Sequence, residues 1–151
     1  MAKYAARKGY HKPTGTIALN YCNNLRIFRY AETLLAYAEL VGVEGVAEQK
    51  GISAQQCLDM VRDRAFGDTN HRVAVNKQNI INENHYEFVG VGHRYYDVVR
   101  WGITEVLNVD NVPGINSART WKSHNKYVAI PQGDIDATKG TEFELKQNEG
   151  Y

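Results

Sequence analysis

The chain has 151 residues, of which 43% are hydrophobic and 23% are charged, and its 18 Lys and Arg against 17 Asp and Glu leave a formal net charge of +1. A chain of this length usually forms one domain and buries roughly 68–70% of its extended surface, which is enough for a core without disulfides or metals. The balanced charge and the scattered basic residues exclude nucleic acid and anionic membrane as electrostatically favoured partners.

The first 24 residues are expected to form an irregular lead-in, because the stretch 11–16 combines proline and glycine in a turn. The chain has no apolar h-region of a signal peptide and no apolar run near the ~20 residues that a bilayer span requires. Two cysteines, Cys22 and Cys57, are too few for a disulfide framework, and neither lies in a C-x-x-C pair. We interpret them as buried thiols, and whether they pair stays open.

Two amphipathic helices are predicted next. From Ile27 onward, apolar residues recur at three- and four-residue steps, which predicts a helix that ends at the glycines within 42–45. An S-x-x-Q run beginning at Ser53 matches a capping box and predicts a second helix, which Gly67 ends. The two helices and their short linker form a hairpin that resembles one tetratricopeptide-type unit in length.

The second half of the chain is expected to be less regular. A third helix is predicted over 77–89 and a fourth from about His93, whereas the turn-forming pairs within 108–126 indicate a long irregular connection. Residues 127–130 are expected to form a short strand that ends at Pro131, because proline offers no amide donor. The fold class predicted from these elements is mainly all-α, with long irregular loops.

Charged residues between positions 62 and 100 are candidates for chemistry. Glu83 and Glu87 lie four residues apart on a predicted helix, whereas glycoside hydrolases place their two carboxylates on opposite sides of the scissile bond. We therefore interpret these acids as partners of arginines, whose planar guanidinium groups suit carboxylates. The expected structural charge network consists of seven residues: Arg62, Arg64, Glu83, Glu87, Arg94, Asp97 and Arg100.

Aromatic residues make up 11% of the chain, and 10 of them are tyrosines. An aromatic ring can stack on the apolar face of a sugar, so this composition permits glycan binding. The candidate ligand-binding residues lie at the end of the long connection and directly after it, and are Trp121, His124 and Tyr127. Tyrosines at helical spacing are expected in the core, namely Tyr30, Tyr37, Tyr86 and Tyr95. None of the five histidines has a metal-binding spacing, so no metal or cofactor is expected.

Five stretches carry a family resemblance: R-Y-A-E-T-L-L-A-Y-A-E at 29–39, V-R-D-R-A at 61–65, E-F-V-G with H-R-Y-Y-D-V-V-R-W-G at 87–102, I-P-Q at 130–132 and Q-N-E-G-Y at 147–151. In this order they resemble the C-terminal part of the SusD/RagB family of outer-membrane nutrient-binding lipoproteins. The sequence departs from the family pattern at three positions, because the family usually has Arg at Asn84, Glu at Val91 and Pro at Glu149.

The resemblance implies a SusD-like helical fold and a non-catalytic function. Family members capture oligosaccharides, or in some branches peptides, on the external face of the outer membrane and deliver them to a SusC-type TonB-dependent transporter. They attach to the membrane through a lipidated N-terminal cysteine. Residues 1–151 are therefore expected to be the C-terminal domain of a longer protein whose N-terminal helical half and lipid anchor lie upstream.

Two alternatives from other functional classes stay open at this point. A helical protein-interaction module would use the hairpin as a peptide platform and would have no affinity for sugars. A carboxylate-dependent glycoside hydrolase would use Glu83 or Glu87 as its acid or base.

Overall fold

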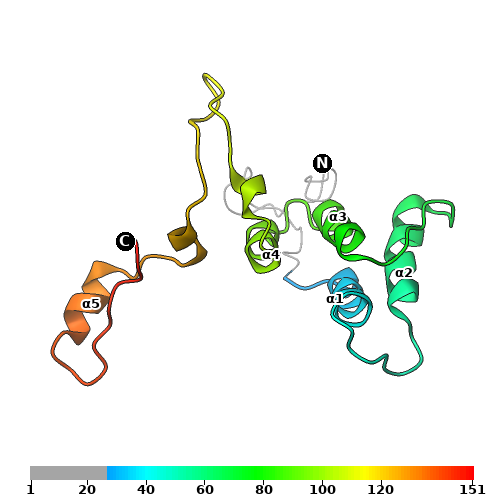
Figure 1. The fold of residues 1–151 in the computed structure, drawn as a ribbon, viewed down its shortest axis with the longest axis horizontal. Helices are drawn as coiled ribbons and strands as arrows, with labels where there is room; N and C mark the ends of the chain where they lie inside the picture. Colours follow the sequence, from blue (N-terminus) through cyan, green and yellow to red (C-terminus); the bar gives the residue numbers. More distant parts are fainter. Residues whose placement is uncertain (1–26) are drawn as a thin grey trace, which may run out of the picture. The chain divides into compact units, whose positions relative to one another are not determined.

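The computed structural model describes residues 27–151, which contain helices but no β-strand (Figure 1). This part of the chain divides between two compact units, Met1–Glu87 and Phe88–Tyr151. The expected all-α fold class is confirmed. The elements of the described residues, in chain order, are α1 (Tyr30–Gly42), α2 (Ala54–Phe66), α3 (Lys77–Glu87), α4 (Arg94–Trp101), the 3-10 helices η2 (Thr104–Leu107) and η3 (Ser123–Lys126), and α5 (Gln132–Thr138).

The core of the first unit forms where α1 packs against α2 and α3. Helices α1 and α2 contribute apolar residues from one face, at the three- and four-residue spacing seen in the sequence, and α3 contributes the adjacent Ile80 and Ile81. Full burial of each Leu, Ile or Val side chain contributes roughly 1.5–3 kcal/mol. The buried apolar residues of these helices are Leu34, Leu35, Ala38, Ala54, Cys57, Leu58, Val61, Ile80 and Ile81.

The ends of α2 agree with the sequence signals. Ser53 Oγ accepts a hydrogen bond from the Gln56 amide at 3.2 Å, and the Gln56 side chain accepts one from the Ser53 amide at 2.8 Å. Gly67 ends the helix in the left-handed conformation, with φ 78°. The capping box and the C-terminal glycine are therefore confirmed, because both depend on contacts within four residues.

The predicted bounds of α1 and α3 are partly wrong. Helix α1 begins at Tyr30 rather than at Ile27, since Arg29 keeps an extended backbone and the side chain of Ile27 is 81% exposed. Helix α3 ends at Glu87 instead of Val89. The apolar pattern therefore starts before the first helical residue of α1 and continues after the last helical residue of α3.

Cys57 lies in the core on α2, and burial raises the pKa of its thiol. This placement agrees with the interpretation of a buried thiol. Cys22 and the expected lead-in of residues 1–24 lie outside the described residues. In the structure the Cys57 thiol is free.

The predicted strand over 127–130 is wrong, because its backbone groups pair with side chains instead of with another strand. The Gln147 side-chain amide accepts a hydrogen bond from the Ile130 N–H and donates one to the Ile130 carbonyl, both at 2.9 Å. Pro131 does not end a strand but precedes helix α5, which the sequence analysis missed. The fixed φ of proline suits this position at the start of a helix.

The C-terminal tail is held against the same segment by two further hydrogen bonds. Asn148 Nδ2 donates to the Val128 carbonyl at 2.7 Å, and the Tyr151 hydroxyl donates to the Tyr127 carbonyl at 2.9 Å. Together with Gln147, these side chains satisfy backbone carbonyls that a neighbouring strand would otherwise bind. The polar and aromatic side chains of the tail therefore hold it against residues 127–130.

We predict that Gly42→Ala destabilises the first unit. A Cβ at position 42 would overlap Val75 Cγ1 and lie 3.0 Å from Ala54 Cβ. Overpacking of this kind costs about 1–3 kcal/mol, more than the ~1 kcal/mol that alanine gains over glycine in a helix. The free energy of unfolding in urea measures the change. Gly133→Ala in α5 is the matched control, because no atom lies within 4 Å of its Cβ position, and it should not destabilise. A Gly42→Ala protein as stable as the unaltered one would contradict the prediction.

We also predict that Gly150→Ala loosens the docked tail. Gly150 has φ +92°, and a Cβ there would lie 2.6 Å from His124 Cβ, so the cost combines backbone strain with a clash. We expect about 1–3 kcal/mol of lost stability, measured by thermal unfolding, and faster amide exchange at the tail. Gly114→Ala is the control, because Gly114 has φ +77° but open space at its Cβ position, so it carries the strain alone. Equal losses in both variants would show that the contact with His124 plays no part.

Candidate functional site

An ion-pair cluster, which we call the Glu87 cluster, joins the segment before α1 to α2 and α3. It consists of Arg29, Arg64 and Glu87. Glu87, whose side chain is 8% exposed, accepts hydrogen bonds from Arg29 Nη2 and, at 2.5 Å, from Arg64 Nη2. Arg29 Nη1 also donates to the Glu87 backbone carbonyl at 3.1 Å. One nearly buried carboxylate is thus shared by two guanidinium groups from different segments.

A second ion pair joins α2 directly to α3. Arg62 Nη1 lies 2.5 Å from Glu83 Oε2, and the Glu83 side chain is 5% exposed. Arg62 Nε also donates to the His71 carbonyl at 2.5 Å, so the same guanidinium fixes the loop that follows α2. Two hydrogen bonds from Arg72 to Asp63 hold the pKa of that half-buried carboxyl below its ordinary value.

The structure brings together most of the expected charge network, in three separate groups. The first two are the Glu87 cluster and the Arg62–Glu83 pair. In the third, Arg100 Nη2 lies 3.2 Å from Asp97 Oδ1 on α4. Arg94 is not brought into an ion pair: within residues 27–151 its Nη1 is buried without a hydrogen-bond partner. Sequence reasoning missed Arg29, because it precedes the helix and its partner is 58 residues away. Its position in the R-Y-A-E stretch was the available signal.

Asn84 occupies a position where the SusD/RagB pattern usually has arginine. Its side-chain Nδ2 donates to the Ile80 carbonyl of the same helix at 2.9 Å. This bond stays within one turn of α3 and brings no charge to the position. The Asn84 side chain therefore binds the backbone of its own helix and joins none of the ion pairs described above.

The geometry of Glu83 and Glu87 does not suit acid–base catalysis. Both carboxylates are nearly buried, and each is bound to an arginine at hydrogen-bonding distance. Neither residue lines any of the hollows described below. Within residues 27–151, no group of three or more His, Cys, Asp and Glu side chains is arranged to hold a metal ion.

We predict that Glu87→Gln lowers stability, because two arginines then share a site without their carboxylate. Removing one partner of a buried pair costs about 3 kcal/mol. The measurement is the free energy of unfolding in urea. Glu142→Gln is the control, since Glu142 is exposed and its loss should change stability little. An unchanged midpoint for Glu87→Gln would mean that the Glu87 cluster contributes nothing to the fold.

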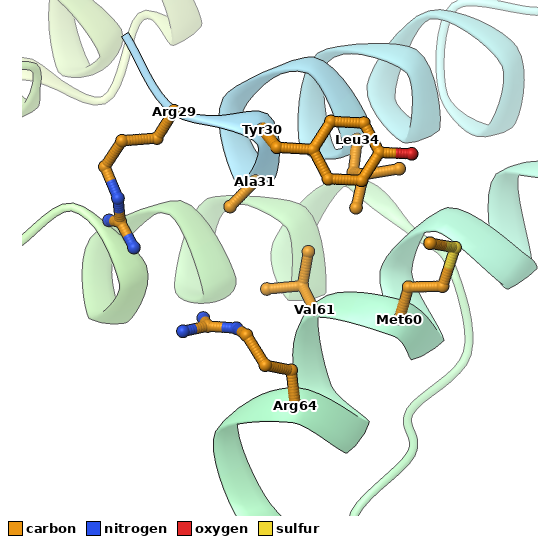
Figure 2. A pocket seen from close by; sticks show the side chains of 7 residues that line it. All are labelled: Arg29, Tyr30, Ala31, Leu34, Met60, Val61 and Arg64. Carbon is orange, nitrogen blue, oxygen red and sulfur yellow. The ribbon is translucent and has the colours of Figure 1, made fainter. Parts of the chain in front are cut away.

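A first pocket, which we call the α1–α2 pocket, is lined by residues of α1, α2 and the segment before α1, and has a volume of about 360 Å³. Figure 2 shows the guanidinium groups of Arg29 and Arg64 at the same end of this pocket, with the side chain of Met60 at the other end. Both arginines are already bound to Glu87. The remaining lining is Tyr30, Ala31, Leu34 and Val61, so the pocket offers mainly apolar surface.

The second hollow, the Trp121 pocket, lies in the second unit and has a volume of about 520 Å³. It mixes aromatic and apolar walls with hydrogen-bonding side chains. Its lining residues are Tyr95, Val106, Leu107, Val109, Arg119, Thr120, Trp121 and Asn125. This composition is typical of small-molecule sites, in which an apolar surface carries a few placed polar groups.

The three candidate ligand-binding residues separate between two hollows. Trp121 lines the Trp121 pocket, whereas His124 and Tyr127 line a smaller one of about 270 Å³ with Ser123 and the tail. The His124 ring makes an edge-on contact with Tyr151, with ring centroids 5.0 Å apart. His124 therefore serves the docking of the tail, and only Trp121 reaches the larger site.

The expectation that four helical tyrosines lie in the core is wrong for three of them. Tyr30 and Tyr86 are each 66% exposed and Tyr95 is 40% exposed. Tyr37 is half-buried, and its hydroxyl donates to the Ile52 carbonyl at 2.9 Å. Helical spacing alone predicted them on the apolar face, whereas the apolar residues buried there are aliphatic in α1 and α3, and Val98 and Trp101 in α4.

Comparisons with known proteins give consistent matches. A model of the SusD family matches residues 1–151. Surface glycan-binding protein A from Bacteroides fluxus is 55% identical with a TM-score of 0.83, covering 98% of this chain and 31% of that one. Surface glycan-binding protein A from Bacteroides thetaiotaomicron is 40% identical with a TM-score of 0.72, and the match covers 90% of this chain and 27% of that protein.

The Bacteroides thetaiotaomicron protein was also solved in complex with laminarihexaose. That structure is 40% identical with a TM-score of 0.72, and the match covers 89% of this chain and 27% of that chain. A search of curated proteins found no match. The chain spans less than a third of the length of these solved relatives.

Proposed function

Since this chain belongs to the SusD family, we propose that it is the C-terminal part of a surface glycan-binding protein that captures oligosaccharides without a chemical reaction. The observation that carries the proposal is the 55% identity, over 98% of the chain, with surface glycan-binding protein A from Bacteroides fluxus. The related structure with laminarihexaose supports a glucose oligosaccharide as the ligand. The names of these relatives describe binding, in agreement with the predicted non-catalytic function.

Two features of the described residues support binding over hydrolysis. The carboxylates that a hydrolase would need, Glu83 and Glu87, are occupied by arginines and lie away from the hollows. The Trp121 pocket, in contrast, combines aromatic rings with hydrogen-bond donors, which suits a sugar. A mainly apolar α1–α2 pocket by itself gives no reason to prefer a protein-interaction module.

The proposal extends to location and partner by family membership. We propose that the whole protein acts at the external face of the outer membrane and passes its ligand to a SusC-type TonB-dependent transporter. Attachment would come from a lipid anchor upstream of residues 1–151. Among the described residues, no helix is both long enough and apolar enough to cross a bilayer.

Calorimetry with laminarihexaose tests the proposed function. We predict saturable binding by the chain joined to its upstream region, and no shorter sugars by chromatography after prolonged incubation. Maltohexaose, which has the same number of glucose units in another linkage, controls for non-specific sugar binding. Absence of any laminarihexaose binding would contradict the proposed ligand class, and release of shorter sugars would contradict the non-catalytic assignment.

A further inference from the structure

We propose that the Trp121 pocket is a glycan subsite that holds a pyranose ring of the bound oligosaccharide. The inference rests on the proposed function and assigns it to a place within residues 95–125. Its volume of about 520 Å³ falls within the ~300–1,000 Å³ of typical ligand sites. Three independent features of the lining support it: the aromatic rings, the unpaired hydrogen-bonding groups and the fixed walls.

The aromatic rings of the pocket offer carbon surface rather than polar atoms. Trp121 is half-buried, and its indole Nε1 is buried without a hydrogen-bond partner among the described residues, so the accessible part of the ring is carbon. The Tyr95 hydroxyl is already bound to the Asn125 carbonyl, which fixes the ring while 40% of the residue stays exposed. Sugars present an apolar C–H face, and aromatic rings bind such faces by stacking.

The polar side chains of the pocket have hydrogen-bonding capacity left over. Within residues 27–151, the side chains of Arg119 and Thr120 make no hydrogen bond or ion pair. Asn125 uses its Oδ1 to accept from the Lys122 amide at 2.8 Å, which leaves its Nδ2 available as a donor. A guanidinium and an amide donate, and a hydroxyl both donates and accepts, so together they match the hydroxyl groups of a sugar.

The walls of the pocket are held in place by the backbone. Val109 and Arg119 exchange two backbone hydrogen bonds, both at 2.8 Å. The Trp121 amide donates to Asn108 Oδ1 at 2.8 Å. Because these bonds exist before a ligand arrives, little order has to be gained on binding, and the loss of conformational entropy is small.

The α1–α2 pocket is a weaker candidate for a sugar. Its two arginines are both engaged by Glu87, and the other lining side chains are mainly apolar. A polyhydroxylated ligand there would lose hydration without gaining matched hydrogen bonds. Of the two larger hollows, the Trp121 pocket therefore fits the ligand class better.

Calorimetry on substituted proteins, again with the upstream region present, tests the subsite. We expect Trp121→Ala to weaken laminarihexaose binding about tenfold through loss of stacking, and Arg119→Ala to weaken it about threefold through loss of one hydrogen-bonding group. Phe143→Ala is the control, because Phe143 is a 75% exposed aromatic residue of the same unit outside the pocket. The Phe143→Ala protein should bind laminarihexaose as tightly as the unaltered protein.

The outcomes separate the subsite from the proposed function. If the unaltered protein fails to bind laminarihexaose, the proposed ligand class fails. If it binds and both Trp121→Ala and Arg119→Ala bind equally well, only the subsite is overturned. Circular dichroism checks folding, and if Trp121→Ala does not fold, the exposed Arg119→Ala decides the question. Weakened binding by Phe143→Ala to the same degree would also overturn the assignment.

Discussion

The first unit depends on one electrostatic constraint, the sharing of the Glu87 carboxylate by two arginines. A carboxylate that is 8% exposed has lost most of its hydration, so its charge must be compensated by groups brought from elsewhere in the chain. Arg29 comes from the segment before α1 and Arg64 from α2. The aliphatic core makes these helices associate, but it is the ion pairs that specify how they are placed, because apolar contacts are non-directional.

The second unit relies more on hydrogen bonds than on a large core. Its fully or nearly buried apolar side chains are few, whereas side-chain amides and a hydroxyl of the C-terminal tail bind the backbone of the segment before α5. Irregular backbone needs such partners, since it has no ladder of its own. The same irregular backbone forms the walls of the Trp121 pocket. The pocket therefore lies in the part of the chain whose structure is hardest to predict from the sequence.

Binding and catalysis place different demands on charged residues, and the described residues suit the proposed binding better than catalysis. In the first unit Glu83 and Glu87 are neutralised by arginines, while the aromatic and donor groups of the second unit line the Trp121 pocket. A non-catalytic receptor needs a stable frame and an adaptable polar surface, with no carboxylate kept free for proton transfer. Because the solved relatives are more than three times as long, the proposed subsite would be one part of a longer ligand-binding surface.

The sequence by itself determined the features that depend on neighbours within about four residues: the apolar faces of the helices, the capping box at Ser53 and the terminating glycine at position 67. It also predicted that Arg62, Arg64, Glu83 and Glu87 are structural partners, but not that Arg29 joins them. Only the tertiary structure decided that the Gln147 side chain binds the backbone N–H and carbonyl of Ile130, and that Tyr95 and Trp121 line one pocket. The physical reason is that periodicity and caps are local, whereas the partner of a buried charge or amide is chosen by how distant segments pack.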